Sequence, residues 1–351
     1  MLQGMTDMGH APSAVVEASA LEAWAAAIMR AAGLAPGAAA TVAAVLGHAS
    51  LRGVDSHGIA RLPGYVERMR AGLVNLDPHP TPAGGGGAVA VIDADGGPGP
   101  VGAALATDHA IDLAREHGAG VVVVRRSGHY GAASYYARRV AEAGMIGMAM
   151  TNAPPGVIPF GGAEPVLGTN PIAFAAPLPG GRIWDLDMAT SQVALNRIYN
   201  ARDEGRAIPL GWGVDAAGEG TTDPAAVHAA VPLGGYKGYA LALMVEVLCG
   251  VLSGAGVAAG VETDVGHFQL ALDPERTVGR TRFAETLAAL LAELKAVPPA
   301  TGVDEVLVPG EPEARAMARR ERDGIPVEPA LWRKLQELAK ALGVPLPPSK
   351  S

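Results

Sequence analysis

Residues 88–124 read AVAVIDADGGPGPVGAALATDHAIDLAREHGAGVVVV, and this stretch decides the fold class. The apolar runs at its two ends, 88–92 and 120–124, have the length and β-branched composition of buried strands. Between them, residues 101–116 repeat apolar side chains at helical spacing. A strand, a helix and a second strand in this order are typical of an α/β fold. Residues 145–151 and 172–176 are further predicted strands.

A glycine pattern of Rossmann type, GPGPVG at residues 97–102, lies between the first strand and the helix. The second strand is followed by Arg125–Arg126, where a Rossmann enzyme that prefers NADP could hold the 2′-phosphate. However, four residues separate Ile92 from the first glycine, whereas the fingerprint follows its strand directly. Pro98 and Pro100 also remove N–H donors from the loop that should bind the pyrophosphate. We therefore reject a Rossmann fold.

Helical periodicity dominates both ends of the chain. The predicted helices outside the opening stretch are two within 19–52, a third from 59–62 to Arg70, then 239–252, 283–294 and the charged tail from 313. The sequence therefore predicts a helical domain formed by residues 1–84 with 300–351, and an α/β domain formed by residues 85–299.

The composition excludes several classes of protein. With 49% hydrophobic and 18% charged residues the chain can build a core, so its 47 glycines do not indicate disorder. A net charge of −8 argues against a nucleic-acid partner, and the basic pairs, such as Arg138–Arg139 and Arg319–Arg320, fit solvated faces. The single cysteine, Cys249, cannot form an internal disulfide and suits a reducing compartment.

Two segments bear on targeting. Residues 1–12 lack the basic flank and apolar core of a secretory signal. Residues 239–261 are almost continuously apolar, but Glu246 interrupts them and no basic flank follows, so we predict a buried helix and no membrane span. We expect a soluble, cytoplasmic protein.

The densest polar cluster near the N-terminus is Asp55–Ser56–His57, followed by Arg61. An imidazole titrates near neutrality and can exchange a proton with an alkoxide. A guanidinium binds a carboxylate with two hydrogen bonds, so Arg61 could orient a carboxylate substrate, and Ser56 could steer the tautomer of His57. A capping loop with surface His and Arg is the alternative.

A second cluster, SGHYGAA at residues 127–133, follows the strand that ends at Val124. Its glycines let backbone approach a ligand, and Ala132 and Ala133 are predicted to start a helix whose N–H groups can face an anion. A tight strand-to-helix turn explains the same residues. Three further islands of polar residues and glycine are 168–171 (GTNP), 187–191 (DMATS) and 234–238 (GGYKG).

Metal or hydrolytic chemistry is the main competing interpretation. A metal could draw on side chains scattered along the chain: His57, His129, His228, His267, Asp187 and Asp223. No H-x-x-x-H, H-E-x-x-H or C-x-x-C spacing connects them, so we predict no metal site. A serine nucleophile elbow, G-x-S-x-G, is also absent from the sequence.

Read in order, the polar islands resemble those of the type 2 malate/L-lactate dehydrogenases, a family that includes ureidoglycolate, sulfolactate, 2,3-diketogulonate-type and cyclic-imine reductases. The resemblance covers about residues 20–345. The matching runs are 54–58 (VDSHG) with Arg61, 127–131 (SGHYG), 168–171, 187–191, 221–224 (TTDP), 233–238 (LGGYKG) and 309–311 (PGE).

The resemblance implies a homodimer with a non-Rossmann, mixed-sheet NAD(P)-binding domain, which reduces 2-oxo acids to 2-hydroxy acids. NAD is slightly favoured over NADP. His57 would be the acid–base group with Ser56 in support, Arg61 would bind the substrate carboxylate, Thr169 would lie near the substrate, and His129 is a second catalytic candidate. The residues implied to line the dinucleotide are His129, Tyr130, Gly131, Ala132, Ala133, Asp187, Met188, Ala189, Lys237, Gly238, Pro309, Gly310 and Glu311.

One segment departs from the family pattern. After Thr190–Ser191 the family usually continues with A-R-G-K, whereas this chain has Ala194–Leu195–Asn196–Arg197. The substrate therefore stays open, and reduction of a cyclic imino acid is the alternative within the family. From another class, the alternative is a metal-dependent hydrolase or lyase.

Overall fold

The computed structural model describes residues 14–262 and 264–350. The chain forms two compact units. Unit 1 comprises residues 1–77, 177–184 and 278–351, and unit 2 comprises residues 78–176 and 185–277. The sequence places the boundaries near 84/85 and 299/300, and this division into a helical and a cofactor-binding domain stays a prediction.

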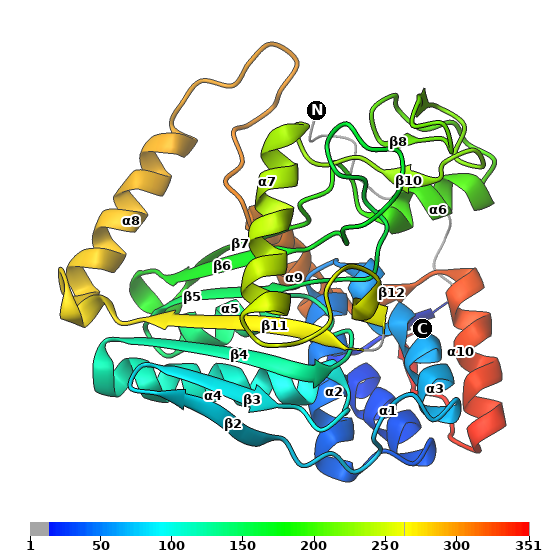
Figure 1. Ribbon diagram of the computed structural model, residues 1–351, viewed down its shortest axis with the longest axis horizontal. Helices are drawn as coiled ribbons and strands as arrows, with labels where there is room; N and C mark the ends of the chain where they lie inside the picture. Colours follow the sequence, from blue (N-terminus) through cyan, green and yellow to red (C-terminus); the bar gives the residue numbers. More distant parts are fainter. Residues whose placement is uncertain (1–13, 263, 351) are drawn as a thin grey trace. The chain divides into compact units, whose positions relative to one another are not determined.

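A seven-stranded sheet organises unit 2 (Figure 1). Its order is β2 (Thr81–Gly86), β3 (Val89–Asp93), β4 (Ala119–Ser127), β11 (Val265–Leu272), β5 (Ile146–Thr151), β6 (Ile172–Pro177) and β7 (Ile183–Met188). Strands β3 and β4 are parallel, whereas β2–β3, β4–β11, β11–β5 and β5–β6 are antiparallel. A Rossmann sheet is parallel throughout its nucleotide-binding half, so the predicted non-Rossmann mixed sheet is confirmed.

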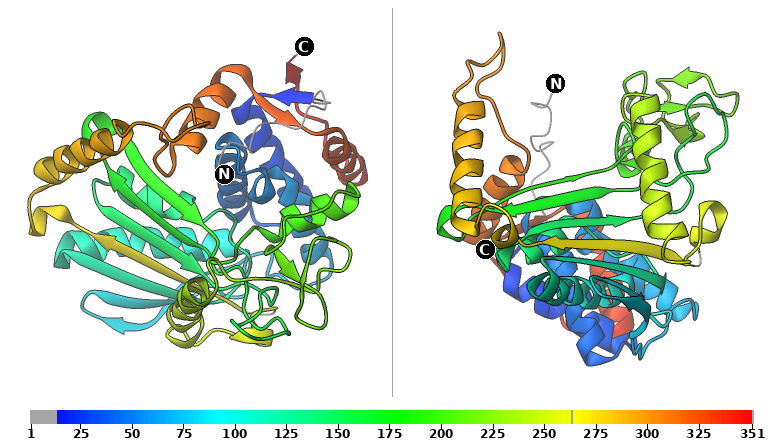
Figure 2. Two further views of the ribbon diagram at one scale, coloured as in Figure 1. Left: turned by 90° about the horizontal axis from the view of Figure 1, so that it is seen from above. Right: turned by 60° about the vertical axis from the view of Figure 1, so that its left-hand side comes forward.

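Helices cover both faces of this sheet (Figure 2). Helices α4 (Gly99–His117) and α5 (Ser134–Glu142) lie on one face, and α7 (Tyr236–Val245) continues as the π-helix η4 (Glu246–Val251) on the other. Val122 and Val124 pack into the α4 side of the core, whereas Val123 packs against Cys249 of η4. Strand β4 is therefore buried on both faces, which explains its unbroken run of valines.

The strand at the centre of the sheet, β11, is not among the strands predicted from the sequence. Its residues include Gly266, His267 and Gln269, which interrupt the apolar pattern of a buried strand. Both polar side chains are nevertheless buried, because β11 lies between β4 and β5. The other elements missed in unit 2 are β2, β7, α6 (Leu195–Asp203), β8 (Gly213–Val214), β9 (Gly220–Thr221) and β10 (Ala229–Ala230).

The predicted buried helix over 239–252 is wrong in two respects. The α-helix ends at Val245 and gives way to the π-helix, and only one side of the segment is buried. Leu243, Met244 and Val247 are exposed, whereas Glu246 is buried. Among the helices described, none combines the length and hydrophobicity needed to cross a bilayer.

Unit 1 contains helices from the N-terminal and the C-terminal parts of the chain. Helices α9 (Glu311–Asp323) and α10 (Pro329–Leu342) follow the loop of residues 296–310 after α8 (Arg280–Lys295). Helix α9 contacts α2 (Pro36–Leu51), and α10 contacts both α1 (Ala18–Ala31) and α3 (Leu62–Arg70). A three-stranded sheet places β1 (Ala14–Val16) between β12 (Ile325–Val327) and β13 (Ser349–Lys350).

Candidate active site

The His57 loop is the catalytic candidate in unit 1. After α2 the chain forms two single 3-10 turns, η1 (Asp55–His57) and η2 (Ile59–Arg61), which lead into α3. Ser56 Oγ lies 2.9 Å from His57 Nδ1, so the hydroxyl and the imidazole share a hydrogen bond. Arg61 Nε donates to the Ser56 carbonyl at 2.7 Å. The structure therefore brings Ser56, His57 and Arg61 together. A loop that only capped a helix would not need these contacts.

The electrostatics of this cluster favour a neutral imidazole. Burial, and then the positive charge of Arg61, lowers the pKa of His57 to about 4. Burial also raises the pKa of the Tyr65 hydroxyl, which therefore stays neutral beside Arg61. At neutral pH His57 is thus able to accept a proton through a ring nitrogen.

The backbone on the C-terminal side of His57 is held against the end of α2. A Cβ on Gly58 would lie 2.2 Å from Ser50 Oγ and 2.9 Å from Ser50 N, so only glycine fits there. The Ile59 amide donates to Ser50 Oγ at 2.8 Å. On the N-terminal side, Asp55 forms an ion pair with Arg320, although the sequence analysis assigned the pair Arg319–Arg320 to a solvated face. That assignment is wrong for Arg320, which is buried.

The 127–133 loop is the first dinucleotide candidate in unit 2. It rests on the glycine segment that resembles a Rossmann fingerprint, because a Cβ on Gly99 would lie 2.1 Å from the Gly128 carbonyl oxygen and 2.5 Å from that of His129. Close packing therefore explains this glycine. The Gly131 amide donates to His129 Nδ1 at 3.4 Å, and the His129 side chain is half-buried.

The neighbours of His129 are deeply buried. The Tyr130 ring stacks on His267 at 4.6 Å between centroids and on Tyr136 at 4.7 Å. Tyr130, Ala132 and Ala133 are 0–2% exposed, so their side chains are part of the core. Only the backbone of these predicted dinucleotide residues could reach a ligand, and Gly131, at φ +82°, has a conformation that favours glycine.

A buried histidine supports this loop from β11. His267 Nε2 lies 2.9 Å from Ser127 Oγ, and its Nδ1 lies 2.8 Å from Thr151 Oγ1. These hydroxyls stand at the ends of β4 and β5, so one imidazole bridges three adjacent strands. Burial lowers the pKa of His267 to about 3, which keeps the ring neutral. From the sequence, His267 was considered only as an alternative metal ligand.

Asp187 occupies the start of α5, close to the same loop. Helix α5 begins at Ser134, and the Ser134 amide donates to Asp187 Oδ2 at 2.8 Å. The helix N-terminus that we expected to face an anion therefore already binds a carboxylate of the chain. Met188 is exposed, and Ala189 is half-buried.

Thr169, the predicted substrate neighbour, precedes a strained residue. The backbone of Asn170 has φ +36°, which is rare for residues other than glycine. Its side-chain amide donates to the Ala242 carbonyl at 3.0 Å and to Glu246 Oε1 at 3.1 Å. Asn152 donates to Glu246 Oε2 at 3.1 Å. The π-helix therefore places a buried carboxylate where it holds two asparagines, and π-helices are frequent at functional sites.

The 168–171 and 187–191 islands also contact each other. Thr190 donates to the Thr169 carbonyl through its amide at 2.8 Å and through its hydroxyl at 3.0 Å. The backbone of Thr169 therefore lies against Thr190, in the segment that follows Asp187. The side chain of Thr169 is half-buried.

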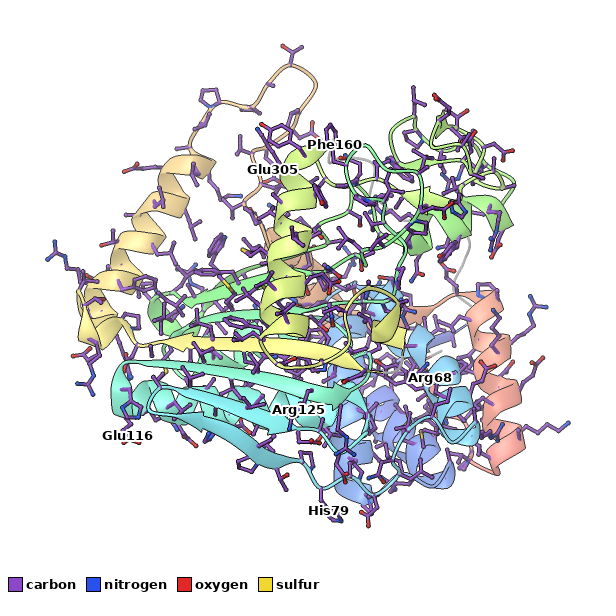
Figure 3. All side chains as sticks on the ribbon, viewed as in Figure 1. Arg68, His79, Glu116, Arg125, Phe160 and Glu305 are labelled. Atoms are coloured by element: carbon purple, nitrogen blue, oxygen red, sulfur yellow. The ribbon has the colours of Figure 1, made fainter. Side chains whose placement is uncertain are left out.

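A cavity of about 440 Å³ opens at the N-terminus of α7. It is lined by Ile158, Phe160, Gly161, Gly162, Ala163, Gln192, Gly211, Ala217, Gly218, Val231, Pro232 and Gly235. Gly235 caps α7, and Lys237 lies exposed in the first turn of that helix. Figure 3 labels Phe160, whose exposed ring meets the exposed Tyr236 ring edge-to-face at 6.3 Å. Gly238 is buried, and a Cβ there would lie 2.4 Å from Leu233 N.

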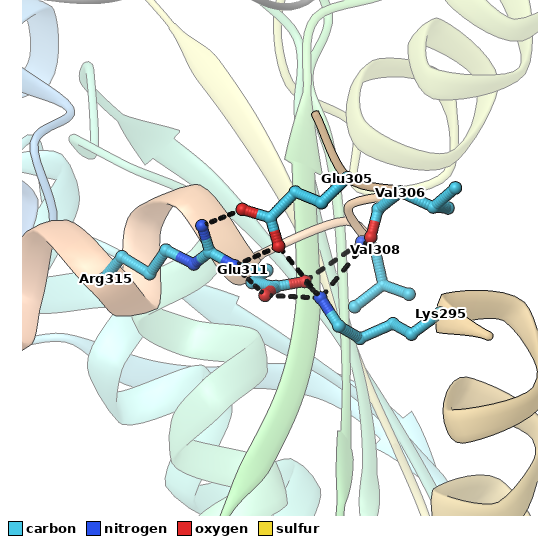
Figure 4. Close-up of polar contacts among 6 residues, drawn as sticks. All are labelled: Lys295, Glu305, Val306, Val308, Glu311 and Arg315. Atoms are coloured by element: carbon cyan, nitrogen blue, oxygen red, sulfur yellow. Dashed lines mark hydrogen bonds and ion pairs between the residues drawn. The ribbon is translucent and has the colours of Figure 1, made fainter. Parts of the chain in front are cut away.

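Glu311 lies in a charged network at the start of α9 (Figure 4). Lys295 Nζ donates to both carboxylate oxygens of Glu311 at 2.6 Å, and Arg315 donates to one of them at 2.6 Å. Arg315 also pairs with Glu305. Burial alone raises the pKa of Glu311, but the hydrogen bonds from Lys295 and Arg315 together outweigh this effect, so the net shift of the pKa is downward. This carboxylate therefore anchors its own loop, and Gly310 precedes it at φ +79°.

The segment that departs from the family pattern contributes to the core of unit 2. Leu195 begins α6 and packs against the cluster that contains Val157 and Ile198. A Cβ on Gly156 would lie 2.7 Å from Leu195 Cδ1. An apolar contact thus stands where the family usually has arginine, and Arg197 is exposed.

The histidines proposed as alternative metal ligands do not converge. His228 Nε2 lies 3.0 Å from Glu164, and His267 is enclosed by two hydroxyls. Across residues 14–262 and 264–350, no group of three or more His, Cys, Asp or Glu side chains is arranged so that it could hold a metal ion.

The candidate residues fit a dinucleotide in chemical type. Lys237 and the N-terminus of α7 can bind phosphate, and the cavity of about 440 Å³ lies beside that helix end. Asp187 offers a carboxylate, and the glycines of the 127–131 loop allow close approach of backbone donors. The His57 loop belongs to unit 1 and these groups to unit 2.

Comparison with known proteins is consistent with these features. The family model for malate/L-lactate dehydrogenase matches residues 16–336. The ureidoglycolate dehydrogenase (NAD(+)) of Escherichia coli (strain K12) is 38% identical over 306 residues, which cover 85% of this chain and 88% of that protein.

Two solved structures are also similar. The malate dehydrogenase of Entamoeba histolytica superposes with a TM-score of 0.91 at 28% identity and covers 95% of this chain and 99% of its own. The Δ1-piperideine-2-carboxylate reductase of Pseudomonas syringae has a TM-score of 0.82 at 32% identity, with 93% and 99% covered. The chain therefore belongs to the malate/L-lactate dehydrogenase family, and the protein is an oxidoreductase of 2-hydroxy and 2-oxo acids.

Proposed function

We propose that the protein transfers a hydride between NAD(H) and C2 of a 2-hydroxy/2-oxo acid, with His57 as the acid–base group. The observation that carries this proposal is the cluster of Ser56, His57 and Arg61, in which one imidazole contacts a hydroxyl and lies within the field of a guanidinium. Such a cluster supplies both a proton acceptor and a carboxylate anchor.

The cluster suggests how proton transfer works in each direction. In oxidation, neutral His57 takes the proton of the substrate hydroxyl on Nε2 while Nδ1–H donates to Ser56 Oγ. In reduction, protonated His57 returns that proton to the carbonyl oxygen. The charge of Arg61 lowers the pKa of His57, so pairing of Arg61 with the substrate carboxylate favours the protonated form when a 2-oxo acid is bound. His129 is the second candidate for proton transfer.

We propose that the candidate residues of unit 2 and the loop before α9 bind the dinucleotide. Bound NAD(H) would supply the hydride acceptor or donor. Lys237 and the amides at the start of α7 would hold phosphate, and the backbone of His129, Tyr130, Gly131, Ala132 and Ala133 would face the cofactor. Asp187, Met188, Ala189, Gly238, Pro309, Gly310 and Glu311 complete the proposed set. NAD is favoured over NADP because the similar E. coli protein is a ureidoglycolate dehydrogenase (NAD(+)).

Substitution of His57 and Arg61 tests the proposal. His57→Ala should lower turnover ~10²-fold or more, the usual scale for loss of general acid–base catalysis. Arg61→Lys should raise KM sharply for carboxylate substrates, because an ammonium cannot reproduce the guanidinium fork. Full activity of His57→Ala, or an equal effect of Arg61→Lys on an uncharged ketone, would contradict the assigned roles.

Reduction of a cyclic imino acid is the second candidate function, favoured by Leu195 at the position where the family usually has arginine and by the Pseudomonas syringae structure. NADH and NADPH oxidation should be compared with oxaloacetate, pyruvate and Δ1-piperideine-2-carboxylate. Turnover of the imine alone would replace the 2-oxo acid assignment. Activity that needs a metal and no nicotinamide would instead favour a hydrolase or lyase.

We also propose a homodimer. The family resemblance implies it, and the exposed apolar side chains Leu243, Met244, Val247 and Val251 on one side of α7 and η4 form a surface that a second copy could cover. Sedimentation equilibrium should give twice the mass of the chain, and the mass of a single chain would contradict it. A cytoplasmic location is a further proposal, which cell fractionation can test.

A further inference from the structure

We infer that Arg320 is a positioning residue for His57 and acts through the carboxylate of Asp55. The inference rests on the proposed function, because it takes His57 as the acid–base group. All three residues belong to unit 1, although Arg320 follows Asp55 by 265 positions in the sequence.

The contact between Arg320 and Asp55 is bidentate. Arg320 Nη1 lies 2.6 Å from Asp55 Oδ1, and Nη2 lies 2.8 Å from Oδ2. Two parallel charge-assisted bonds fix both the distance and the plane of the carboxylate. Asp55 begins the single turn η1 that ends at His57, so fixing Asp55 fixes the start of the turn that carries the imidazole.

The same guanidinium also binds the end of α2. Arg320 Nη1 donates to the Ser50 carbonyl, and the Ser50 hydroxyl accepts from the Ile59 amide at 2.8 Å. Gly58 packs directly against Ser50. The backbone is thus held at position 55 before His57 and at positions 58–59 after it, and Ser50 and Arg320 connect the two anchors.

The burial of Arg320, but not of Asp55, indicates that the guanidinium has a local task. The side chain of Arg320 is 10% exposed and that of Asp55 is 57% exposed. A buried guanidinium is costly unless its donors are used. Nη1 and Nη2 of Arg320 bind the Asp55 carboxylate and the Ser50 carbonyl, whereas Nε has no partner among the described residues. Arg319, on the same helix, is exposed and provides a matched control.

Replacement of Arg320 should separate catalysis from binding. Arg320→Gln should lower kcat ~100-fold, the scale of a catalytic group misplaced by about 1 Å, while the KM for NADH changes little. Arg320→Lys should recover part of kcat, since an ammonium can contact one carboxylate oxygen but cannot form the fork. Asp55→Asn should lose activity in the same direction, and Arg319→Gln should behave like wild type.

A second readout does not depend on activity. In wild type the ring of His57 titrates with a pKa of about 4, owing to burial and the charge of Arg61. In Arg320→Gln the released loop exposes the ring to water, so the pKa measured by histidine NMR should rise toward its ordinary 6.5. A purely structural role of Arg320 would lower the melting temperature without moving this pKa in the folded protein.

The outcomes are distinguishable. Folded Arg320→Gln with wild-type kcat and an unchanged His57 pKa would overturn the inference, and so would an equal loss in Arg319→Gln. If Arg320→Gln does not fold, Asp55→Asn decides by the same two measurements, because its side chain is half-exposed. Full activity of His57→Ala would remove the proposed function alone, and the His57 pKa in Arg320→Gln would still test the positioning role.

Discussion

Acid should destabilise unit 2 through His267, the buried imidazole between β4, β11 and β5. Its pKa in the folded protein is about 3, lowered by burial from an ordinary value of 6.5. Between these values the unfolded chain binds a proton that the folded chain does not bind. The free energy of unfolding therefore falls as the pH drops below 6.5, by about 1.4 kcal/mol per pH unit.

The size of the effect follows from the two pKa values. Between pH 7.5 and pH 4.5, proton binding to unfolded His267 should remove about 2.6 kcal/mol of stability. His267→Gln lacks this titration. At pH 7.5 the variant should be less stable by about 1–3 kcal/mol, because the buried hydroxyl of Ser127 loses its bond to the imidazole, whereas Thr151 keeps its bonds to backbone carbonyls. The gap between wild type and variant should then shrink by about 2.6 kcal/mol as the pH falls.

Hydrogen exchange of the β4 and β11 amides, corrected for the intrinsic rate at each pH, measures the opening of the unit that contains His267. Contributions from other titrating groups cancel in the difference between the two proteins. His79→Gln is the control for replacing a histidine by glutamine as such, since His79 lies exposed in the same unit (Figure 3). Parallel curves for wild type and His267→Gln would refute the argument.

Three further substitutions test the packing that supports the candidate site. Gly99→Ala places a Cβ 2.1 Å from the Gly128 carbonyl oxygen and should weaken NADH binding, measured by calorimetry, about 10-fold or more. Gly64→Ala is the control, because a Cβ there meets nothing within 4 Å and NADH affinity should not change. Equal NADH affinities of the two variants would contradict the packing role of Gly99. Gly58→Ala forces a Cβ to 2.2 Å from Ser50 Oγ and should lower kcat more than the KM for NADH, so a wild-type kcat would count against a tightly held His57 loop. Glu246→Gln replaces one carboxylate oxygen, which accepts a hydrogen bond from Asn152 or Asn170, by an NH2 group that cannot accept it. Thermal unfolding should show a loss of about 1–3 kcal/mol of stability. An unchanged melting temperature would show that the network contributes little to stability.

Elements with strong local signals could be predicted from the sequence. The valine run of β4, the helix α4 and the paired helices α1 and α2 follow from apolar periodicity, which depends on neighbours in the chain. Local features also sufficed to reject a Rossmann fingerprint at residues 97–102, because two prolines remove N–H donors and the pattern does not follow its strand directly. The structure adds the positive reason for Gly99, which is contact with the backbone of another loop.

Elements set by distant contacts could not be predicted in this way. Strand β11 lies between β4 and β5 although His267 and Gln269 interrupt its apolar pattern, because both neighbouring strands pair with its backbone and the hydroxyls of Ser127 and Thr151 bind the His267 ring. Glu246 is buried for a similar reason, since two asparagines from other segments bind it. The buried side-chain amide of Gln269 has no hydrogen-bond partner among the described residues.

The fold class, the family and the candidate cluster of Ser56, His57 and Arg61 could be predicted from the sequence, because spacing and residue type along short segments carry that information. How the segment that carries His57 is held depends on tertiary contacts. Arg320 reaches Asp55 across 265 residues, and no local pattern distinguishes it from the exposed Arg319 beside it. Burial and pairing depend on which distant segments pack together, and the pKa of the imidazole depends on that packing in turn.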